Sequence, residues 1–195
     1  MAKSVEVEVK PIRLICGLGN PGAAYEKTRH NIGFSVIDKA VGGASFKKEG
    51  KCLFLEERFA GRNIMWVKPQ SYMNLSGDAL LGILSKKRVK PEEVLVVVDD
   101  VALNLGKIRF RENGSHGGQN GLRNIIARMG SNFPRLRVGV GPVPAGRDLA
   151  DYVLAKPGPD EWGSWNEVLS RSVEALETAV SEGVSVAMNK WNGSK

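Results

Sequence analysis

Cysteine, histidine and aromatic residues are scarce in this chain, which has two cysteines, two histidines and 7% aromatic residues among its 195 residues. Neither Cys16 nor Cys52 has a second cysteine or a histidine at a metal-ligand spacing. We therefore expect two reduced, packed thiols and neither a disulfide framework nor a zinc site. No apolar run approaches the ~20 residues of a membrane span, and the N-terminus lacks the apolar core of a signal peptide. These absences predict a cytoplasmic protein that does not enter a membrane.

The composition is that of one globular domain. Hydrophobic residues make up 42% of the chain and charged residues 25%, which excludes the disordered and fibrous classes. A chain of this length can bury roughly 70% of the surface that it exposes when unfolded, and no repeat or linker divides it. We expect an N-terminal extension over residues 1–11, a single domain over residues 12–191 and a short tail over residues 192–195.

Acidic residues are nearly absent from one stretch of the chain. Lysine and arginine number 28 against 21 aspartate and glutamate residues, and between Leu103 and Arg147 the only acid is Glu112. The basic residues of that stretch are Lys107, Arg109, Arg111, Arg123, Arg128, Arg135, Arg137 and Arg147. A basic region that is also rich in glycine and asparagine predicts a surface for a polyanion. On charge alone, a solvated basic face remains the alternative.

Short apolar runs alternate with amphipathic stretches. The runs typical of buried strands are Ile12–Leu18, Leu53–Ala60, Ile64–Val67, Val94–Val98 and Leu136–Val140. The stretches with helical spacing are Ile32–Val41, Leu75–Arg88, Gly118–Met129 and an apolar face from Trp162 to Val180. This alternation predicts a layered α/β fold. In it, Val94–Val98 should be a central strand that presents Asp99 and Asp100 at its carboxyl end.

The segment Gly17–Gly22 matches the spacing of a dinucleotide-binding glycine motif, and a nicotinamide-dependent oxidoreductase is therefore one alternative. The surrounding sequence argues against it. The next helix begins late, and Asp38, the acid at the nearest spacing, lies inside the helical pattern rather than at the end of a second strand. We interpret these glycines as a tight turn that frees the backbone around Asn20.

His30 and Asp99 together could activate a water molecule, with the imidazole as general base and the carboxylate orienting it. Three amides, Asn20, Asn74 and Asn120, lie at element boundaries, where neutral donors could hold a peptide-like substrate and polarise its carbonyl. For Asn74 the structural alternative is a helix cap. The sequence contains neither a nucleophile elbow nor a phosphate-binding lysine loop, so water activated by histidine is the chemistry best supported.

Five motifs are specific enough to indicate a family. They are Gly17–Gly22 with Tyr25 and Thr28–Asn31, Lys68–Gly77, Val98–Asp100, His116–Leu122 and Phe133–Gly139. Together they resemble bacterial-type peptidyl-tRNA hydrolase, in the same order, over a match from about Ile12 to about Asn189. The resemblance implies a monomeric, single-domain α/β/α sandwich on a mixed twisted sheet. It further implies hydrolysis of the ester between a peptide and the 3′ end of tRNA, without a metal or organic cofactor.

The resemblance also implies a role for each matching residue. His30 would deprotonate the attacking water and Asp99 would orient His30. Asn20 and Asn74 would contact the peptide and the reacting carbonyl, and Asn120 would also help hold the acceptor end. Tyr25 would pack near the 3′ nucleotides and Met73 beside the peptide. Three arginines would clamp the 5′ phosphate and the acceptor stem of the tRNA: Arg109, Arg111 and Arg137.

Two positions depart from the family pattern. Gln119 stands where the family more often has histidine, and Ala102 stands where an aspartate commonly follows the Asp99–Asp100 pair. Neither change removes an assigned catalytic group, but either could alter the grip on the substrate or the pH profile. The alternative function is that of a non-catalytic RNA-binding relative acting in organellar intron splicing. Two observations favour the enzyme. The first is that five site residues are retained, namely His30, Asp99, Asn20, Asn74 and Asn120, and the second is the absence of an arginine- and serine-rich transit-like leader.

Overall fold

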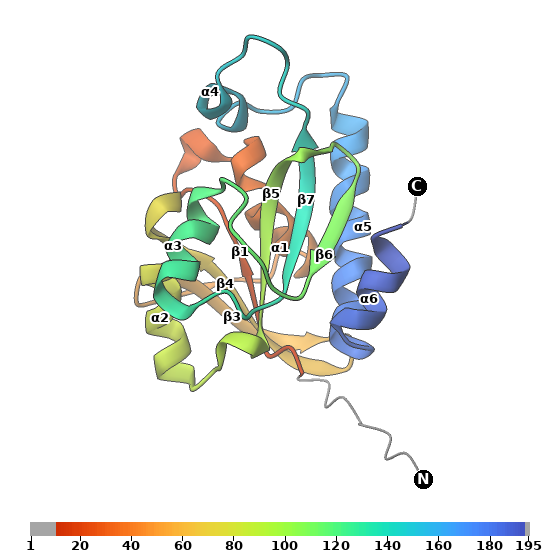
Figure 1. Cartoon of the computed structure of the whole chain (residues 1–195). Coiled ribbons are helices and arrows are strands. Elements are labelled where there is room, and N and C mark those ends of the chain that lie inside the picture. The colour runs from red at the N-terminus through yellow and green to blue at the C-terminus, as the bar shows by residue number, and fades with distance from the viewer. Residues whose placement is uncertain (1–10, 194–195) are drawn as a thin grey trace.

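The computed structural model describes residues 11–193 and is built on one mixed sheet of seven strands. Across the sheet the strand order is β2-β3-β4-β1-β5-β7-β6. The strands are β1 (Leu14–Gly17), β2 (Lys47–Glu49), β3 (Cys52–Phe59), β4 (Arg62–Pro69), β5 (Val94–Asn104), β6 (Ile108–Arg111) and β7 (Arg135–Gly141). The four central strands run parallel, and the antiparallel strands lie at the edges. The carboxyl ends of the parallel strands therefore meet at one end of the molecule (Figure 1).

Helices cover both faces of the sheet, so the α/β/α sandwich is confirmed (Figure 1). One core cluster joins the odd-numbered residues of β5 to α1 and α5, and the other joins its even-numbered residues to α2 and α3. The helices are α1 (Ile32–Ala40), α2 (Ser76–Lys87), α3 (Asn120–Met129), α4 (Leu149–Val153), α5 (Trp162–Ser181) and α6 (Val184–Trp191). The run Val94–Val98 is fully buried, as expected of a strand with a helical layer on each side.

Several elements differ from the sequence prediction. Strand β5 continues beyond Val98 to Asn104, with a register shift against β7 after Asp100. The short elements β2, β6, α4 and α6 were not predicted, because three to eight residues carry too little periodicity to separate an element from a loop. The alternating residues Ile108–Arg111, assigned only to the basic stretch, form the edge strand β6.

The C-terminal end is tied to the sheet. Asn192, assigned from the sequence to a short tail, accepts a hydrogen bond from the Phe110 amide (2.7 Å) and donates one to the Phe110 carbonyl (3.1 Å). One carboxamide thus pairs both main-chain groups of an edge-strand residue, which blocks strand addition there. The predicted extension over residues 1–11 lies, apart from Pro11, outside the described residues.

Glycines bring the end of β1 into contact with the start of α1. A Cβ on Gly33 would lie 2.4 Å from the Leu18 amide nitrogen and 2.5 Å from the Val97 carbonyl oxygen, and one on Gly17 would lie 2.3 Å from the Gly33 carbonyl oxygen. Neither Gly17 nor Gly33 has a positive φ, so the tight-turn interpretation is wrong at Gly17. The requirement is for space between strand and helix, and within Gly17–Gly22 a positive φ occurs only at Gly22.

The two cysteines are free and buried, as predicted. Burial raises the pKa of Cys52 to about 12 and raises that of Cys16 as well. Both thiols are therefore protonated at neutral pH, which suits a packing role. Among the described residues no three histidine, cysteine or acidic side chains gather as metal ligands, and no helix is long and apolar enough to cross a membrane.

Gly33→Ala should lower the free energy of unfolding by about 3 kcal/mol, because the added methyl overlaps main-chain atoms of β1 and β5 that cannot move aside. The matched control is Gly82→Ala in α2, where a Cβ meets nothing within 4 Å and helix propensity should add about 0.5–1 kcal/mol. Urea unfolding midpoints measure both changes. Equal stability of the two variants would contradict the close-contact role of Gly33.

Candidate active site

A cleft of about 580 Å³ opens at the carboxyl ends of the parallel strands. One wall comes from the loop before α3, and another comes from α4 and its two flanking residues. The lining includes eight of the residues that matter below: Asn20, His30, Met73, Asn74, Asp99, His116, Gln119 and Asn120. The sequence placed most of these residues at separate element boundaries, and the fold brings them to one opening.

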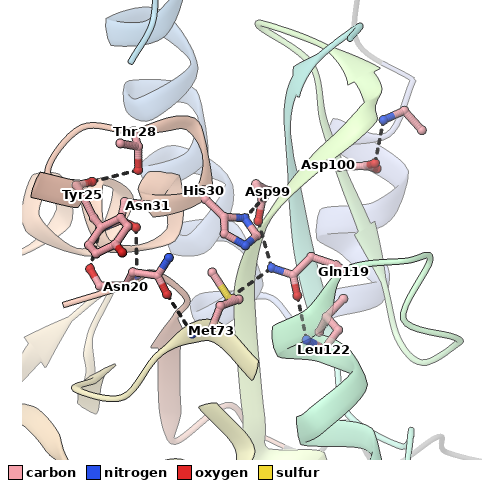
Figure 2. Close-up of polar contacts among 11 residues, drawn as sticks. Asn20, Tyr25, Thr28, His30, Asn31, Met73, Asp99, Asp100, Gln119 and Leu122 are labelled. Carbon is pink, nitrogen blue, oxygen red and sulfur yellow. Dashed lines mark hydrogen bonds and ion pairs between the residues drawn. The ribbon is translucent and has the colours of Figure 1, made fainter. Parts of the chain in front are cut away.

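His30 and Asp99 both line the cleft, and their side chains face each other (Figure 2). His30 lies in a 3-10 turn, η2 (Arg29–Asn31), directly before α1, and Asp99 lies on β5 just after its fully apolar section. The His30 Nδ1 atom is 2.8 Å from Asp99 Oδ2, and their side chains are 12% and 4% exposed. The predicted pair is confirmed as a contact between residues that are 69 positions apart.

Two opposing effects determine the pKa of the His30 imidazole. Burial lowers the pKa of its imidazole, while the charge of Asp99 and the hydrogen bond to it raise that pKa, and the net effect is a raised value. An imidazole bonded through Nδ1 to a carboxylate carries its proton on Nδ1 when neutral. His30 Nε2 then has a free lone pair and can accept a proton from water.

Arg29 anchors the turn that carries His30. Its side chain is buried, with Nη2 2.5 Å from Glu161 Oε2 and the guanidinium 4.4 Å from the ring centre of Tyr152. The Arg29 amide also donates to the Ala155 carbonyl oxygen at 3.0 Å. These contacts join η2 to the segment between α4 and α5, so His30 and the α4 wall of the cleft are held as one unit.

Gln119 contacts Asp99 from the side opposite His30 (Figure 2). Its Nε2 atom donates to Asp99 Oδ1 at 3.0 Å and lies 3.2 Å from the Met73 sulfur. Its Oε1 atom accepts from the Leu122 amide at 2.7 Å and so caps α3. Sequence reasoning treated Gln119 only as a departure from a pattern. Its spacing to Leu122, typical of a helix cap, was the only local signal.

Asn20 is locked into one orientation. Its Oδ1 atom accepts from the Met73 amide at 2.7 Å, so its Nδ2 group is the end left for a ligand. Asn31 bonds to the Asn20 backbone twice, accepting from the amide and donating to the carbonyl oxygen, each at 2.8 Å (Figure 2). Asn31 is a supporting residue that the sequence analysis did not single out.

Asn74 and Asn120 line the cleft with exposed side chains. The cap alternative for Asn74 is wrong, because no side chain caps α2 from its own N-terminal residues. Asn124 of α3 does so instead, since its Oδ1 accepts from the amides of Gly77 (2.7 Å) and Asp78 (3.2 Å). The Asn74 amide is thus left for the cleft. Asn120 Oδ1 accepts from Arg123 at 3.1 Å.

Tyr25 lies beside the cleft rather than in its lining. Its ring packs edge-on against that of Tyr72, with 6.5 Å between the ring centres, and Tyr72 is 60% exposed at the cleft. Thr28 donates to the Tyr25 carbonyl oxygen at 2.8 Å (Figure 2). Met73 is buried, lines the cleft and contacts Gln119 through its sulfur.

The arginines of β6 and β7 share one face of the sheet. Arg109 pairs with Arg137 in the antiparallel register, and Arg111 pairs with Arg135. Only Arg137 lines the cleft, and its Nε atom is 3.0 Å from Asp100 Oδ2. Like charges opposite each other across strands are unfavourable, and a polyanion lying over this face would relieve them. Arg109 and Arg111 extend the positive face away from the cleft.

Arg135 is a buried member of this group. It donates to the carbonyl oxygens of Gly114 (2.7 Å), Ser131 (2.9 Å) and Phe133 (3.0 Å), so it supports the loop before α3. Burial, together with the charge of Arg137, lowers its pKa to about 10. It remains charged at neutral pH and adds to the positive potential beside the cleft.

Two further cleft residues, Asp100 and His116, received no role from the sequence. Asp100 pairs with Arg137, and its Oδ1 accepts from the Ala102 amide at 2.9 Å, so position 102 contributes main chain rather than side chain. His116 Nδ1 accepts from the Gly118 amide at 3.0 Å.

The residues behind the dinucleotide-binding alternative have other roles in the structure. Gly17 and Gly33 serve strand–helix packing, and Asp38 is paired with Lys68.

These features define an α/β protein whose cleft combines a histidine–carboxylate pair, neutral amides and adjoining arginines. A family model described as peptidyl-tRNA hydrolase matches residues 14–195. The chain belongs to the peptidyl-tRNA hydrolase family.

Individual relatives agree with this assignment. The peptidyl-tRNA hydrolase of Fervidobacterium nodosum is 42% identical over 179 residues, which cover 92% of this chain and 95% of the relative. That of Roseiflexus castenholzii is 45% identical over 184 residues, covering 92% and 86%. A crystal structure of peptidyl-tRNA hydrolase from Acinetobacter baumannii superimposes with a TM-score of 0.89 at 32% identity, covering 96% of this chain and 97% of that one. These findings do not support the splicing alternative.

The imidazole of His30 should titrate above its ordinary pKa of ~6.5, and Asp99→Asn should move it below that value, because burial then acts without the opposing charge. A raised pKa in the folded state also means that the pair stabilises the protein at acid pH, and that this contribution is lost as the pH rises through the folded pKa. NMR titration of the imidazole protons measures the midpoint, and His116→Gln assigns the two signals. A midpoint unaffected by Asp99→Asn would contradict the coupling.

Proposed function

We propose that this protein hydrolyses the ester bond between the peptide and the tRNA 3′ end in peptidyl-tRNA, releasing free peptide and free tRNA. The observation that carries the proposal is the 2.8 Å contact between His30 and Asp99 in a cleft lined by neutral amides. An uncharged amide lining suits a peptide ester, and the arginines beside it suit tRNA phosphates. Family membership and the related structure support the same reaction.

His30 is the proposed general base. Its Nε2 atom takes a proton from water while the water oxygen attacks the ester carbonyl carbon. Asp99 holds the imidazole through Nδ1 and offsets the positive charge that develops on it. When the tetrahedral intermediate collapses, the bond between the carbonyl carbon and the ribose oxygen breaks. The proton held by His30 then passes to that ribose oxygen.

The amides are proposed to hold the substrate. Asn20 offers its Nδ2 group because Oδ1 is already bonded to the Met73 amide, so it can donate to the carbonyl oxygen as negative charge develops there. Asn74, with a carboxamide that caps no helix, contacts the peptide. Asn120 contacts the acceptor end, and Met73 flanks the peptide. Tyr25, whose ring packs against Tyr72, lies near the 3′ nucleotides.

The arginines are proposed to clamp the acceptor stem. Arg109 and Arg137 face the same way, and Arg111 continues the same row along β6. Guanidinium groups match phosphate oxygens with two parallel hydrogen bonds. A terminus with fewer phosphate charges would make fewer of these contacts. The expected monomeric state, cytoplasmic location and independence of metal and organic cofactors stay predictions.

Purified protein should release peptide from an N-blocked aminoacyl-tRNA. His30→Ala and Asp99→Asn should each lower kcat by about 10²–10⁴-fold, since each removes part of the proton-transfer machinery. The rising limb of kcat/KM against pH should lie above ~6.5, because the base must be unprotonated and its pKa is raised. A chelator-treated sample tests the expected absence of a metal.

The fold of each variant is checked by circular dichroism before rates are compared. Near-normal turnover in either variant would refute the proposed mechanism. Release that stops with the chelator and returns with added metal would refute metal independence. Binding of tRNA without release by the unmodified chain would refute the proposed function.

Arg109→Ala, Arg111→Ala and Arg137→Ala should each weaken tRNA binding and reduce the slope of log Kd against log salt by ~0.7–0.9 per lost phosphate contact. Arg137→Ala should have the largest effect, because it also leaves Asp100 without its cation. Arg62→Ala is the matched control, since this exposed residue begins β4 at the opposite end of the sheet. Slopes equal to that of Arg62→Ala would place the three arginines outside the contact.

A further inference from the structure

The Gln119 side chain joins Asp99 to the start of α3. Its carboxamide donates from Nε2 to Asp99 Oδ1 (3.0 Å) and accepts at Oε1 from the Leu122 amide (2.7 Å). It lies at the N-cap of α3 and is partly buried. Three residues thus lie in one hydrogen-bonded row: His30, Asp99 and Gln119 (Figure 2).

The orientation of the Gln119 carboxamide is set by the backbone. A main-chain N–H can only donate, so the group that meets the Leu122 amide must be the oxygen. The NH₂ end is thereby turned toward Asp99. The hydrogen bond to the Leu122 amide therefore determines which end of the Gln119 carboxamide faces Asp99.

Gly121 leaves the room that the Gln119 carboxamide occupies. A Cβ on Gly121 would lie 3.0 Å from Gln119 Oε1 and 2.6 Å from the Met73 sulfur. The absence of a side chain at position 121 therefore lets both groups approach the start of α3. The Met73 sulfur in turn lies 3.2 Å from Gln119 Nε2, and the Met73 main-chain amide donates to Asn20 Oδ1.

Asp99 needs a second donor for a physical reason. Its side chain is 4% exposed, so water is not freely available to satisfy the oxygen that His30 does not use. With one oxygen on His30 and the other on Gln119, the carboxylate is held at both ends and its plane is fixed. The second donor is uncharged, so the negative charge that faces His30 is not neutralised by a cation.

We propose that Gln119 is a positioning residue for the reaction, which orients Asp99 and through it His30. This inference rests on the proposed function and deepens it. The residue does not touch the reacting atoms. Its contribution is to keep Asp99 Oδ2 directed at His30 Nδ1 throughout the cycle, including the stage at which the imidazole becomes charged.

The alternative is that Gln119 serves only as a helix cap. Gln119→Ser separates the two roles, because a serine hydroxyl can accept from the Leu122 amide as an N-cap but is too short to reach Asp99. Gln119→Ala removes both contacts. If Gln119 positions Asp99, kcat should fall about tenfold in both variants, while KM changes by less than about twofold. Thermal unfolding should show that Gln119→Ser retains more stability than Gln119→Ala.

A double-mutant cycle tests whether Gln119 acts through Asp99. In an Asp99→Asn background, Gln119→Ser should cost less than about twofold in kcat, because the charged group that it orients is no longer present. Normal kcat in Gln119→Ser, or the full tenfold loss in both backgrounds, would overturn the inference.

A measurement independent of activity separates failure of this inference from failure of the proposed function. The chain has only two glutamines, at positions 70 and 119, so Gln119→Ser assigns the two side-chain amides in a ¹⁵N NMR spectrum. One Gln119 amide proton should resonate downfield and move upfield in Asp99→Asn, as expected for a bond to a carboxylate. Gln119 signals that are insensitive to Asp99→Asn would overturn the inference even if peptide release were confirmed.

Discussion

The buried carboxylate of Asp99 is the constraint on which the site depends. It stands where the central strand β5 emerges from a fully apolar section, at the carboxyl end of the parallel strands. A buried anion is costly unless it is hydrogen-bonded. The fold meets this requirement with His30 from the turn before α1 and Gln119 from the start of α3. Helices on opposite faces of the sheet therefore converge on one side chain.

The close contact between β1 and α1 makes this convergence possible. Because Gly17 and Gly33 carry no side chains, α1 begins directly above the end of β1, next to β5. The turn before α1 then reaches Asp99 with His30, and Asn31 from the same turn holds the Asn20 backbone. One packing contact thus sets the position of the proposed base and of the amide proposed to face the substrate carbonyl.

Neutral and charged groups are separated within the site. Amides line the part of the cleft near His30, whereas the arginines begin with Arg137 in the lining and continue along β6 with Arg109 and Arg111 outside it. Asp100, the neighbour of Asp99, points to the other side of β5 and pairs with Arg137. Two successive carboxylates on one strand therefore serve different parts of the site, because alternate residues of a strand face opposite ways. This separation fits a substrate that is a peptide ester at one end and a polyanion at the other.

The sequence by itself determined the layered fold, the order of the long strands and helices, and most of the site. Apolar runs and helical spacing are local properties, and His30, Asp99 and the three asparagines stand at recognisable boundaries. The short elements β6 and α6 escaped prediction because few residues carry their pattern. Asn192 escaped because its partner, Phe110, lies 82 residues away.

Only the tertiary structure decided how the polar groups are paired. Main-chain amides determine the orientation of two carboxamides in the cleft. The Met73 amide binds Asn20 Oδ1 and the Leu122 amide binds Gln119 Oε1, which leaves the NH₂ group of each side chain for other partners. Asn124, which belongs to α3, caps α2 in place of Asn74. The arginines became a row only through the register of β6 against β7. Hydrogen bonds depend on position and direction in space, and neither is contained in a local pattern of residues.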